Sequence, residues 1–186
     1  MTDRICARIE NIRREKGRVL VAIDGRCAAG KTTLALQLQE KLGCPLFHMD
    51  DFFLRPEQRT QERYAQPGGN VDRERFREEV LIPLKAGSEI AYRRFDCRTM
   101  ELQAPVVIHP GEVNLVEGTY SCHPALWEDC DLHIFMTVSP EAQLARLAQR
   151  DAQKLAMFQS RWIPLEERYF AAFALQSRCE LVFETG

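Results

Sequence analysis

The sequence predicts an α/β fold in which helices cover both faces of a parallel β-sheet. Short runs of Val, Ile and Leu alternate along the chain with amphipathic helical segments, and this alternation is typical of a parallel sheet. The first apolar run leads into residues 25–32, GRCAAGKT, which match the phosphate-binding pattern G-x-x-x-x-G-K-[ST] in full. The motif requires a strand before it and a helix after it, in agreement with the alternation. The length of 186 residues corresponds to roughly one domain.

The N-terminal part of the chain predicts the order helix, strand, loop, helix, strand. Isoleucines at helical spacing predict a first helix that ends at Gly17. Residues 18–24 are rich in Val and Ile, which indicates a short buried strand. Beyond the loop, leucines at every fourth position predict a helix that ends at Gly43, and a second strand follows over 45–49.

The middle of the chain contains two segments that exceed a minimal core. Residues 50–70 are polar, rich in Pro and Gly and poor in apolar periodicity, so we expect a loop with at most a short helix. Loops of this length in a compact domain are usually functional. A helix is predicted over 72–85. Residues 89–109 contain two extended pieces around a turn, which suggests a β-hairpin outside the main sheet.

The C-terminal part continues the alternation. Ser139 and Pro140 have the residue types of a helix N-cap and a first-turn proline, and Leu144 and Leu147 are expected on the buried face of that helix. No repeat or linker divides the chain, so we predict one domain over 1–186. The remaining strands and helix are expected over 113–117, 131–138, 164–176 and 179–183.

Composition and charge exclude several classes of protein. With 25 Lys and Arg against 27 Asp and Glu, the net charge is −2, and no global basic field attracts a nucleic acid or an anionic membrane. No apolar run approaches the roughly 18 residues of a membrane span, and the charged N-terminus lacks the apolar stretch of a signal peptide. The seven cysteines include no C-x-x-C pair. We therefore expect a reduced, cytoplasmic protein with no nucleic-acid or membrane partner.

The phosphate-binding motif explains the residue types of its loop. Gly25 and Gly30 let the backbone approach a polyphosphate closely, and the loop N–H groups point at the anion. Lys31 brings a positive charge to the β- and γ-phosphates, and the Thr32 hydroxyl is suited to ligate Mg²⁺. We predict nucleotide contacts from Gly25, Cys27, Ala28, Ala29, Gly30, Lys31, Thr32 and Thr33.

Cys27 is the one nucleophilic side chain within this loop. A helix N-terminus lowers the pKa of a nearby thiol. This leads to the hypothesis that Cys27 is a thiolate and that its alkylation blocks nucleotide binding. The alternative is that Cys27 is a tolerated small residue.

Carboxylates follow two of the predicted strands directly. Asp50 comes after the second strand, and Glu117 ends the strand over 113–117. Ligands of parallel α/β sheets bind at the carboxyl ends of the strands, so both should converge on the phosphate loop. Asp50 is a candidate base for an acceptor hydroxyl, with Asp51 as a lesser candidate for a metal or capping contact. Glu117 is expected to share a Mg²⁺ site with Thr32. The alternative for each carboxylate is a helix cap or a salt bridge.

Several stretches together resemble the uridine kinase and phosphoribulokinase branch of the P-loop kinases. The phosphate loop is specific only to the superfamily, whereas D-x-F-[FY] with a later E-G indicates this branch. The resemblance covers roughly residues 19–183. It is carried by the loop and by Met49-Asp50-Asp51-Phe52-Phe53, Asn70-Val71-Asp72, Tyr92, Val116-Glu117-Gly118 and Arg150-Asp151.

The resemblance implies a P-loop NTPase fold with a five-stranded parallel sheet, a small β-hairpin at the acceptor site and a helical lid over roughly 146–161. It implies ATP and Mg²⁺ as cofactors. Asp50 matches the catalytic Asp of the family, Asp72 a carboxylate that contacts ribose, and Tyr92 an aromatic beside the acceptor base. Arg150 begins the arginine-bearing lid. We expect catalytic roles for Asp50, Lys31 and Arg150, and substrate contacts from Asp50, Phe53, Asp72, Tyr92 and Arg94.

The sequence departs from the family at the acceptor base. The family has a base-reading His a few residues after Tyr92, whereas this chain has Arg94 or Cys97 in that neighbourhood. The predicted function is ATP-dependent phosphoryl transfer to a hydroxyl of a small molecule, first a nucleoside such as uridine or cytidine. Pantothenate or a sugar phosphate is the alternative acceptor, the latter because of the nearby Arg55, Arg93, Arg94 and Arg98.

Two non-kinase functions were weighed against this prediction. A GTP-dependent regulatory module usually carries N-K-x-D and D-x-x-G, and neither pattern occurs in the chain. A P-loop ATPase that remodels a partner more often has a strand ending in Asp than in Glu117-Gly118. The expected partner is thus a small nucleoside-like acceptor, and a homo-oligomer stays open.

Overall fold

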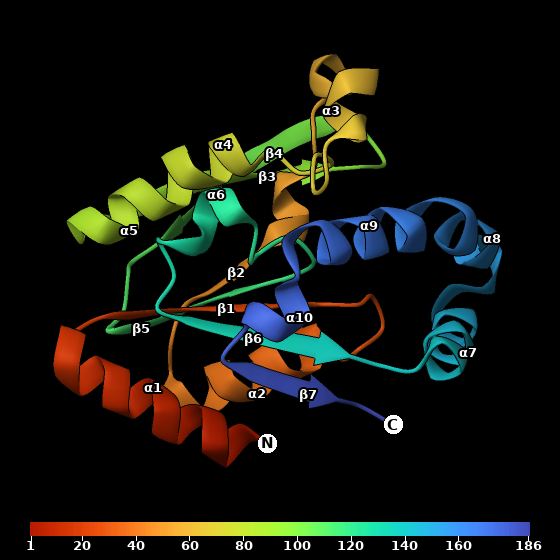
Figure 1. The fold of residues 1–186 in the computed structure, drawn as a ribbon. Coiled ribbons are helices and arrows are strands. Elements are labelled where there is room, and N and C mark those ends of the chain that lie inside the picture. The colour runs from red at the N-terminus through yellow and green to blue at the C-terminus, as the bar shows by residue number, and fades with distance from the viewer.

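A five-stranded parallel sheet forms the centre of the computed structural model, which describes residues 1–186 (Figure 1). The strand order is β2-β5-β1-β6-β7, and each neighbouring pair is parallel. This confirms the predicted sheet. The strands are β1 (Val19–Gly25), β2 (Leu46–His48), β5 (Val113–Glu117), β6 (Leu132–Thr137) and β7 (Leu181–Glu184).

Each face of the sheet has its own apolar core. Alternate residues of β1 point to opposite faces: Val21 and Ile23 pack with the helices α1 (Thr2–Lys16) and α2 (Lys31–Leu42), whereas Leu20 packs on the other face. In Figure 1, α1 and α2 lie below the sheet and the other core helices lie above it. These are α5 (Ile82–Ala86), α6 (Pro124–Trp127), α9 (Ile163–Phe173) and α10 (Leu175–Arg178).

The helix expected over 72–85 is present as one continuous helical segment. It consists of α4 (Arg73–Phe76), a π-helical turn (Arg77–Leu81) and α5. The Asp72 side chain caps it by accepting a hydrogen bond from the Arg75 N–H. The preceding long segment contains the 3₁₀ turns Met49–Phe52 and Pro56–Gln58 and the short helix α3 (Gln61–Ala65), as expected of a loop with little helix.

The predicted hairpin is a separate two-stranded antiparallel sheet made of β3 (Ile90–Asp96) and β4 (Glu101–Ile108). It packs against the turn Met49–Phe52 and the π-helical turn before α5. Both long segments beyond the minimal core therefore lie on the same side of the central sheet, at the top of Figure 1 together with α3.

A helical arm connects β6 to α9. It runs through α7 (Pro140–Asp151), a 3₁₀ turn (Ala152–Lys154), α8 (Leu155–Met157) and a π-helical turn (Phe158–Trp162). Ser139 caps α7 as predicted, because its hydroxyl accepts a hydrogen bond from the Ala142 N–H. Leu147 is buried as expected, but Leu144 is only half-buried and Gln143 takes the second buried position. None of the helices has the length and apolar character required to cross a membrane.

Candidate phosphoryl-transfer site

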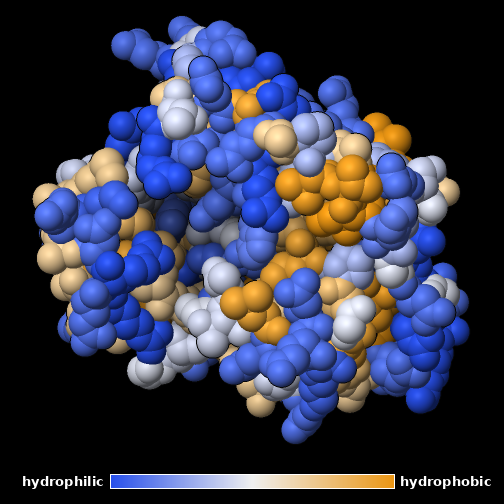
Figure 2. Space-filling model, turned by 180° about the vertical axis from the view of Figure 1, so that it is seen from behind, coloured by the Kyte–Doolittle hydropathy of each residue, from blue (hydrophilic) through white to orange (hydrophobic).

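A cavity of about 550 Å³ lies at the carboxyl ends of the central strands. The phosphate loop and the ends of β2 and β5 form one wall, and the helical arm forms another. Seen from the rear, the surface is hollowed and the rim of the hollow is mostly hydrophilic (Figure 2). The carboxyl ends of three strands thus converge on one crevice, as the positions of the motifs predicted.

The backbone of the phosphate loop has the shape that its two glycines allow. Gly25 has φ +128°, and a Cβ there would lie 1.9 Å from the carbonyl oxygen of Met136. Gly30 is left-handed and begins α2. Lys31 is buried, and its Nζ donates hydrogen bonds to the carbonyl oxygens of Gly25 and Arg26 at 2.7 and 2.9 Å. The lysine is therefore held inside the curve of the loop.

Asp24 holds the start of the phosphate loop through buried hydrogen bonds. Its buried carboxylate accepts hydrogen bonds from the backbone N–H groups of Gly25, Tyr120 and Cys122 at 2.6, 3.1 and 2.8 Å, and from the Tyr169 hydroxyl at 2.8 Å. Burial raises its pKa, and the donors oppose that shift. Asp24 thereby joins the end of β1 to the segment after β5 and to α9.

Thr32 and Glu117, the two predicted magnesium ligands, are in contact. The Thr32 hydroxyl donates to Glu117 Oε2 at 3.1 Å, and Glu117 Oε1 lies 2.6 Å from His48 Nδ1. The hydrogen bond with Glu117 raises the pKa of His48. Hard oxygen donors beside an anion-binding loop fit Mg²⁺. His48 was missed in the sequence because its proximity depends on strand order: His48 and Glu117 are register partners on β2 and β5.

Asp50 and Asp51 differ sharply in their surroundings. Asp51 accepts a hydrogen bond from the Tyr92 hydroxyl at 3.1 Å and pairs with Arg94 at 3.3 Å. Asp50 has no such partner, and its carboxylate lines the cavity. Desolvation raises the pKa of Asp50, and Lys31 offsets part of that shift. Asp50 is thus the carboxylate available to a ligand.

The predicted substrate residues fall into two groups. Asp50 and Phe53 line the cavity, together with Asn70 and Cys97. Asp72, Tyr92 and Arg94 do not line it. Tyr92 is buried and stacks near Phe52, with ring centroids 5.3 Å apart. A direct contact of these three residues with substrate stays a prediction.

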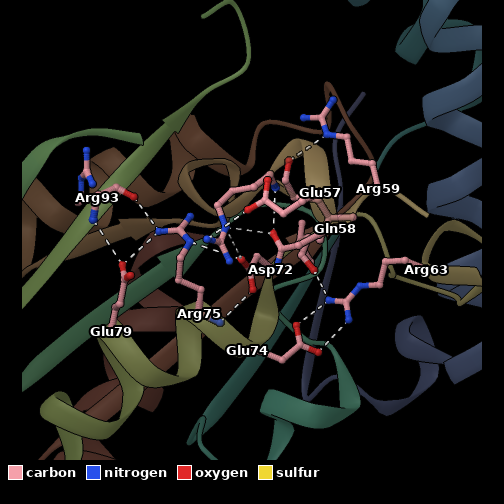
Figure 3. Close-up of polar contacts among 12 residues, drawn as sticks. Glu57, Gln58, Arg59, Arg63, Asp72, Glu74, Arg75, Glu79 and Arg93 are labelled. Atoms are coloured by element: carbon pink, nitrogen blue, oxygen red, sulfur yellow. Dashed lines mark hydrogen bonds and ion pairs between the residues drawn. The ribbon is translucent and has the colours of Figure 1, made fainter. Parts of the chain in front are cut away.

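Asp72 belongs to a polar network that surrounds Arg75 beside the Met49–Phe52 turn (Figure 3). The Arg75 guanidinium lies 3.7 Å from Asp72 and donates to Glu79 and to the Arg93 carbonyl at 3.1 and 2.7 Å. It also lies over the Phe52 ring at 4.3 Å. The network joins α4 to the hairpin and holds the Met49–Phe52 turn that carries Asp50.

The helical arm contributes cations and aromatics to the cavity. Arg146 is engaged, because it donates to the Ala28 carbonyl and the Thr185 hydroxyl at 3.0 and 2.9 Å. Lys154 pairs with Asp151 at 2.8 Å. Arg150 has no carboxylate partner and lies 5.3 Å from the Phe158 ring. Of the three cationic side chains from the arm that line the cavity, Arg150 is thus the one available to a phosphate.

The expectation that Cys27 is a thiolate is wrong. Its side chain is buried, and the Gln143 amide donates to its Sγ at 3.2 Å. Desolvation, with the nearby Glu166 carboxylate, raises the pKa of Cys27 to about 12. These effects outweigh the influence of the helix N-terminus.

We accordingly expect Cys27 to react slowly with alkylating reagents. Treatment of the ligand-free protein with iodoacetamide at pH 8, followed by peptide mapping, should modify Cys97 well before Cys27. Cys97 is the exposed cysteine, and its thiol is the reactivity reference on the same cavity. Faster labelling of Cys27 than of Cys97 would contradict the assignment of a buried, protonated thiol.

Glu166 is the main residue of the cavity that the sequence did not single out. Its carboxylate is buried and accepts a hydrogen bond from the Cys27 N–H at 3.0 Å. It also lies 3.3 Å from the Thr119 hydroxyl, which is 3.0 Å from the Gly25 carbonyl oxygen as well. Desolvation raises its pKa. A signal was available: Glu166 lies three and four positions before the apolar Tyr169 and Phe170, so it shares their buried face.

Similarity to known proteins is confined to solved structures. No family model matches the chain, and no curated protein matches it. A possible uridine kinase from Bacillus stearothermophilus is 21% identical, with TM-score 0.67 over 97% of this chain and 99% of that chain. A candidate fructose transport system kinase from Silicibacter is 24% identical, with TM-score 0.72 over 98% of both chains.

A third neighbour, D-glycerate 3-kinase from Cryptococcus neoformans, is 14% identical, with TM-score 0.57 over 85% of this chain and 78% of that chain. The three neighbours carry the names of kinases that act on different small molecules. What they share with this chain is the overall fold. The chain therefore has the fold of the P-loop kinases.

Proposed function

We propose that this protein transfers the γ-phosphoryl group of ATP to a hydroxyl group of a small molecule. The observation that carries the proposal is the placement of Asp50, a carboxylate without a partner, in the same cavity as Lys31 and the phosphate loop. A kinase needs a phosphate-binding element and an acceptor base within one site. The kinase names of the structural neighbours support the same class.

The chemistry divides among the residues of the cavity. The loop N–H groups, Lys31 and Arg150 hold the phosphates and offset the charge of the migrating phosphoryl group. Thr32 and Glu117 would hold Mg²⁺, which supplies further charge neutralisation when it is bound. Asp50 orients the acceptor hydroxyl and takes its proton, and the raised pKa of Asp50 makes it a stronger base than an Asp with an ordinary pKa.

The proposed acceptor is a nucleoside or a similar neutral hydroxyl compound. The arginines that favoured a sugar phosphate have partners within the protein, so a second anion would have to compete with these partners. Their partners are carboxylates for Arg55, Arg94 and Arg98, and hairpin carbonyl oxygens for Arg93. Cys97 lines the cavity in the neighbourhood where uridine kinases have a His, so the base preference is expected to differ from theirs.

An ATP-consumption screen with Mg²⁺ tests the proposal. Nucleosides, pantothenate and sugar phosphates are supplied as separate acceptors, and the Lys31→Ala variant reports contaminating activity. We expect ATP turnover to rise with a neutral nucleoside-like acceptor and the product to carry one new phosphate ester. Stimulation by no acceptor, together with tight binding of GTP, would overturn the kinase assignment.

A further inference from the structure

The Glu166 carboxylate occupies the inner side of the phosphate loop. One oxygen accepts a hydrogen bond from the Cys27 N–H, and the other lies 3.3 Å from the Thr119 hydroxyl, whose single proton also has the Gly25 carbonyl oxygen within reach at 3.0 Å. Cys27 and Thr119 both line the cavity. The N–H groups of such a loop bind phosphate oxygens because they converge on one point. In the ligand-free protein, a carboxylate oxygen thus takes one of these donors.

The position of Glu166 is imposed by the helix that carries it. Its neighbour Glu167 forms two hydrogen bonds with the Arg26 guanidinium, at 2.6 and 2.9 Å. One turn further along α9, the Tyr169 hydroxyl donates to Asp24. Contacts from three residues of α9 therefore attach this helix to the loop and to the end of β1, and they leave the Glu166 carboxylate little freedom to move away.

We propose that Glu166 imitates a phosphate oxygen at the Cys27 amide, and that a nucleotide phosphate competes with the ionised carboxylate for this donor, so that nucleotide binding is coupled to uptake of a proton from the solvent by Glu166. The inference rests on the proposed function, since it assumes that the loop binds a nucleotide. It makes Glu166 a residue that sets nucleotide affinity, because its carboxylate competes with a phosphate oxygen for the Cys27 N–H.

The charges around Glu166 explain why nucleotide binding and the ionisation of Glu166 are linked. Lys31 is the closest source of positive charge, but its Nζ is engaged with the carbonyl oxygens of the loop. The ionised Glu166 carboxylate and a phosphate are both negative, and they repel each other when both lie at the Cys27 N–H. Protonation of Glu166 removes this repulsion. The titratable and charged groups that face Glu166 are Asp24 from β1, Arg26 and Cys27 from the loop, Lys31 from α2 and Tyr120 after β5.

Calorimetric titration with MgATP at pH 6 and pH 8 tests this proposal on the wild type, Glu166→Gln and the control Glu141→Gln, which removes an exposed carboxylate of α7 that does not line the cavity. At pH 8 we expect Glu166→Gln to bind MgATP about 10-fold more tightly than the wild type, because a charged hydrogen-bond competitor worth about 1.5–3 kcal/mol is weakened. The advantage should shrink at pH 6, since ionised Glu166 becomes scarcer there. The control should follow the wild type at both pH values.

Equal or weaker binding by Glu166→Gln at pH 8 would overturn the proposal. A second measurement uses the wild type alone and so does not depend on the folding of a variant. The NMR resonance of the Cys27 amide should shift when MgATP is added. In the absence of MgATP, the same resonance should follow the titration of Glu166. A Cys27 amide resonance that responds neither to MgATP nor to the titration of Glu166 would also overturn the proposal. If wild-type protein binds no MgATP at either pH, the proposed function fails instead.

Discussion

Asp50→Asn is expected to keep the ATP affinity of the wild type and to lower the rate of phosphoryl transfer by about 10²- to 10⁴-fold, the usual contribution of a general base. The carboxylate lies in the cavity without a hydrogen-bond partner, so the amide breaks no hydrogen bond of the protein itself. Initial rates at saturating ATP and acceptor, with ATP affinity from calorimetry, measure both quantities. Transfer at the wild-type rate would contradict the assignment of Asp50 as the base.

Asp51→Asn is the matched control for this variant. It removes the same charge one residue away, from a side chain that binds Tyr92 and Arg94 rather than a ligand. We expect it to reduce stability or acceptor affinity while the chemical step continues. A large loss of transfer in Asp51→Asn with none in Asp50→Asn would reverse the two roles.

The pKa of Asp50 predicts the acid limb of the pH–rate profile. A base acts only when ionised, and desolvation by the surrounding cavity raises the pKa of Asp50 above the ordinary value. Activity should therefore fall, as pH decreases, at a higher pH than an Asp with an ordinary pKa would produce. This acid limb should be absent from the residual activity of Asp50→Asn.

Local patterns were enough to predict the fold. The alternation of apolar strands and amphipathic helices follows from side-chain periodicity, and caps such as Ser139 and Gly43 act within a few residues of themselves. The phosphate loop is equally local, because one strand, one turn and one helix N-terminus build it. Leu144 shows where prediction from local patterns stops. Its half-burial depends on how α7 is rotated against the loop, and the local sequence does not determine this rotation.

The site was harder to predict where it depends on residues far apart in the chain. Glu166 contacts a loop residue 139 positions earlier, and burial of the Cys27 thiol, together with this carboxylate, reverses the pKa shift that the helix N-terminus alone suggested for Cys27. The pairing of His48 with Glu117 follows from β2 and β5 being neighbours. In the same way Tyr92, an aromatic in a predicted strand, packs against Phe52 on the buried side of the hairpin. Motifs indicated the chemistry, whereas tertiary contacts decide the ionisation of each group.

Lys31→Ala is expected to weaken ATP binding by about 100-fold or more, since hydrogen bonds to charged groups are each worth about 1.5–3 kcal/mol and the ammonium reaches more than one phosphate oxygen. The loss has a second cause. Nζ also bridges the carbonyl oxygens of Gly25 and Arg26, so its removal loosens the curve of the empty loop. Calorimetric titration with MgATP measures the affinity, and thermal unfolding checks that the variant is folded.

Lys41→Ala is the control for charge, because Lys41 lies on the same helix, is exposed and pairs with Asp3 at the surface. Both variants remove one positive charge from α2, yet only Lys31 lies in the cavity. Screening by salt makes the exposed pair of Lys41 worth little, so this variant should bind ATP as the wild type does. Equal losses of ATP affinity in the two variants would assign the effect to the net charge of α2. Wild-type ATP affinity in Lys31→Ala would contradict the assignment of the loop to the nucleotide site.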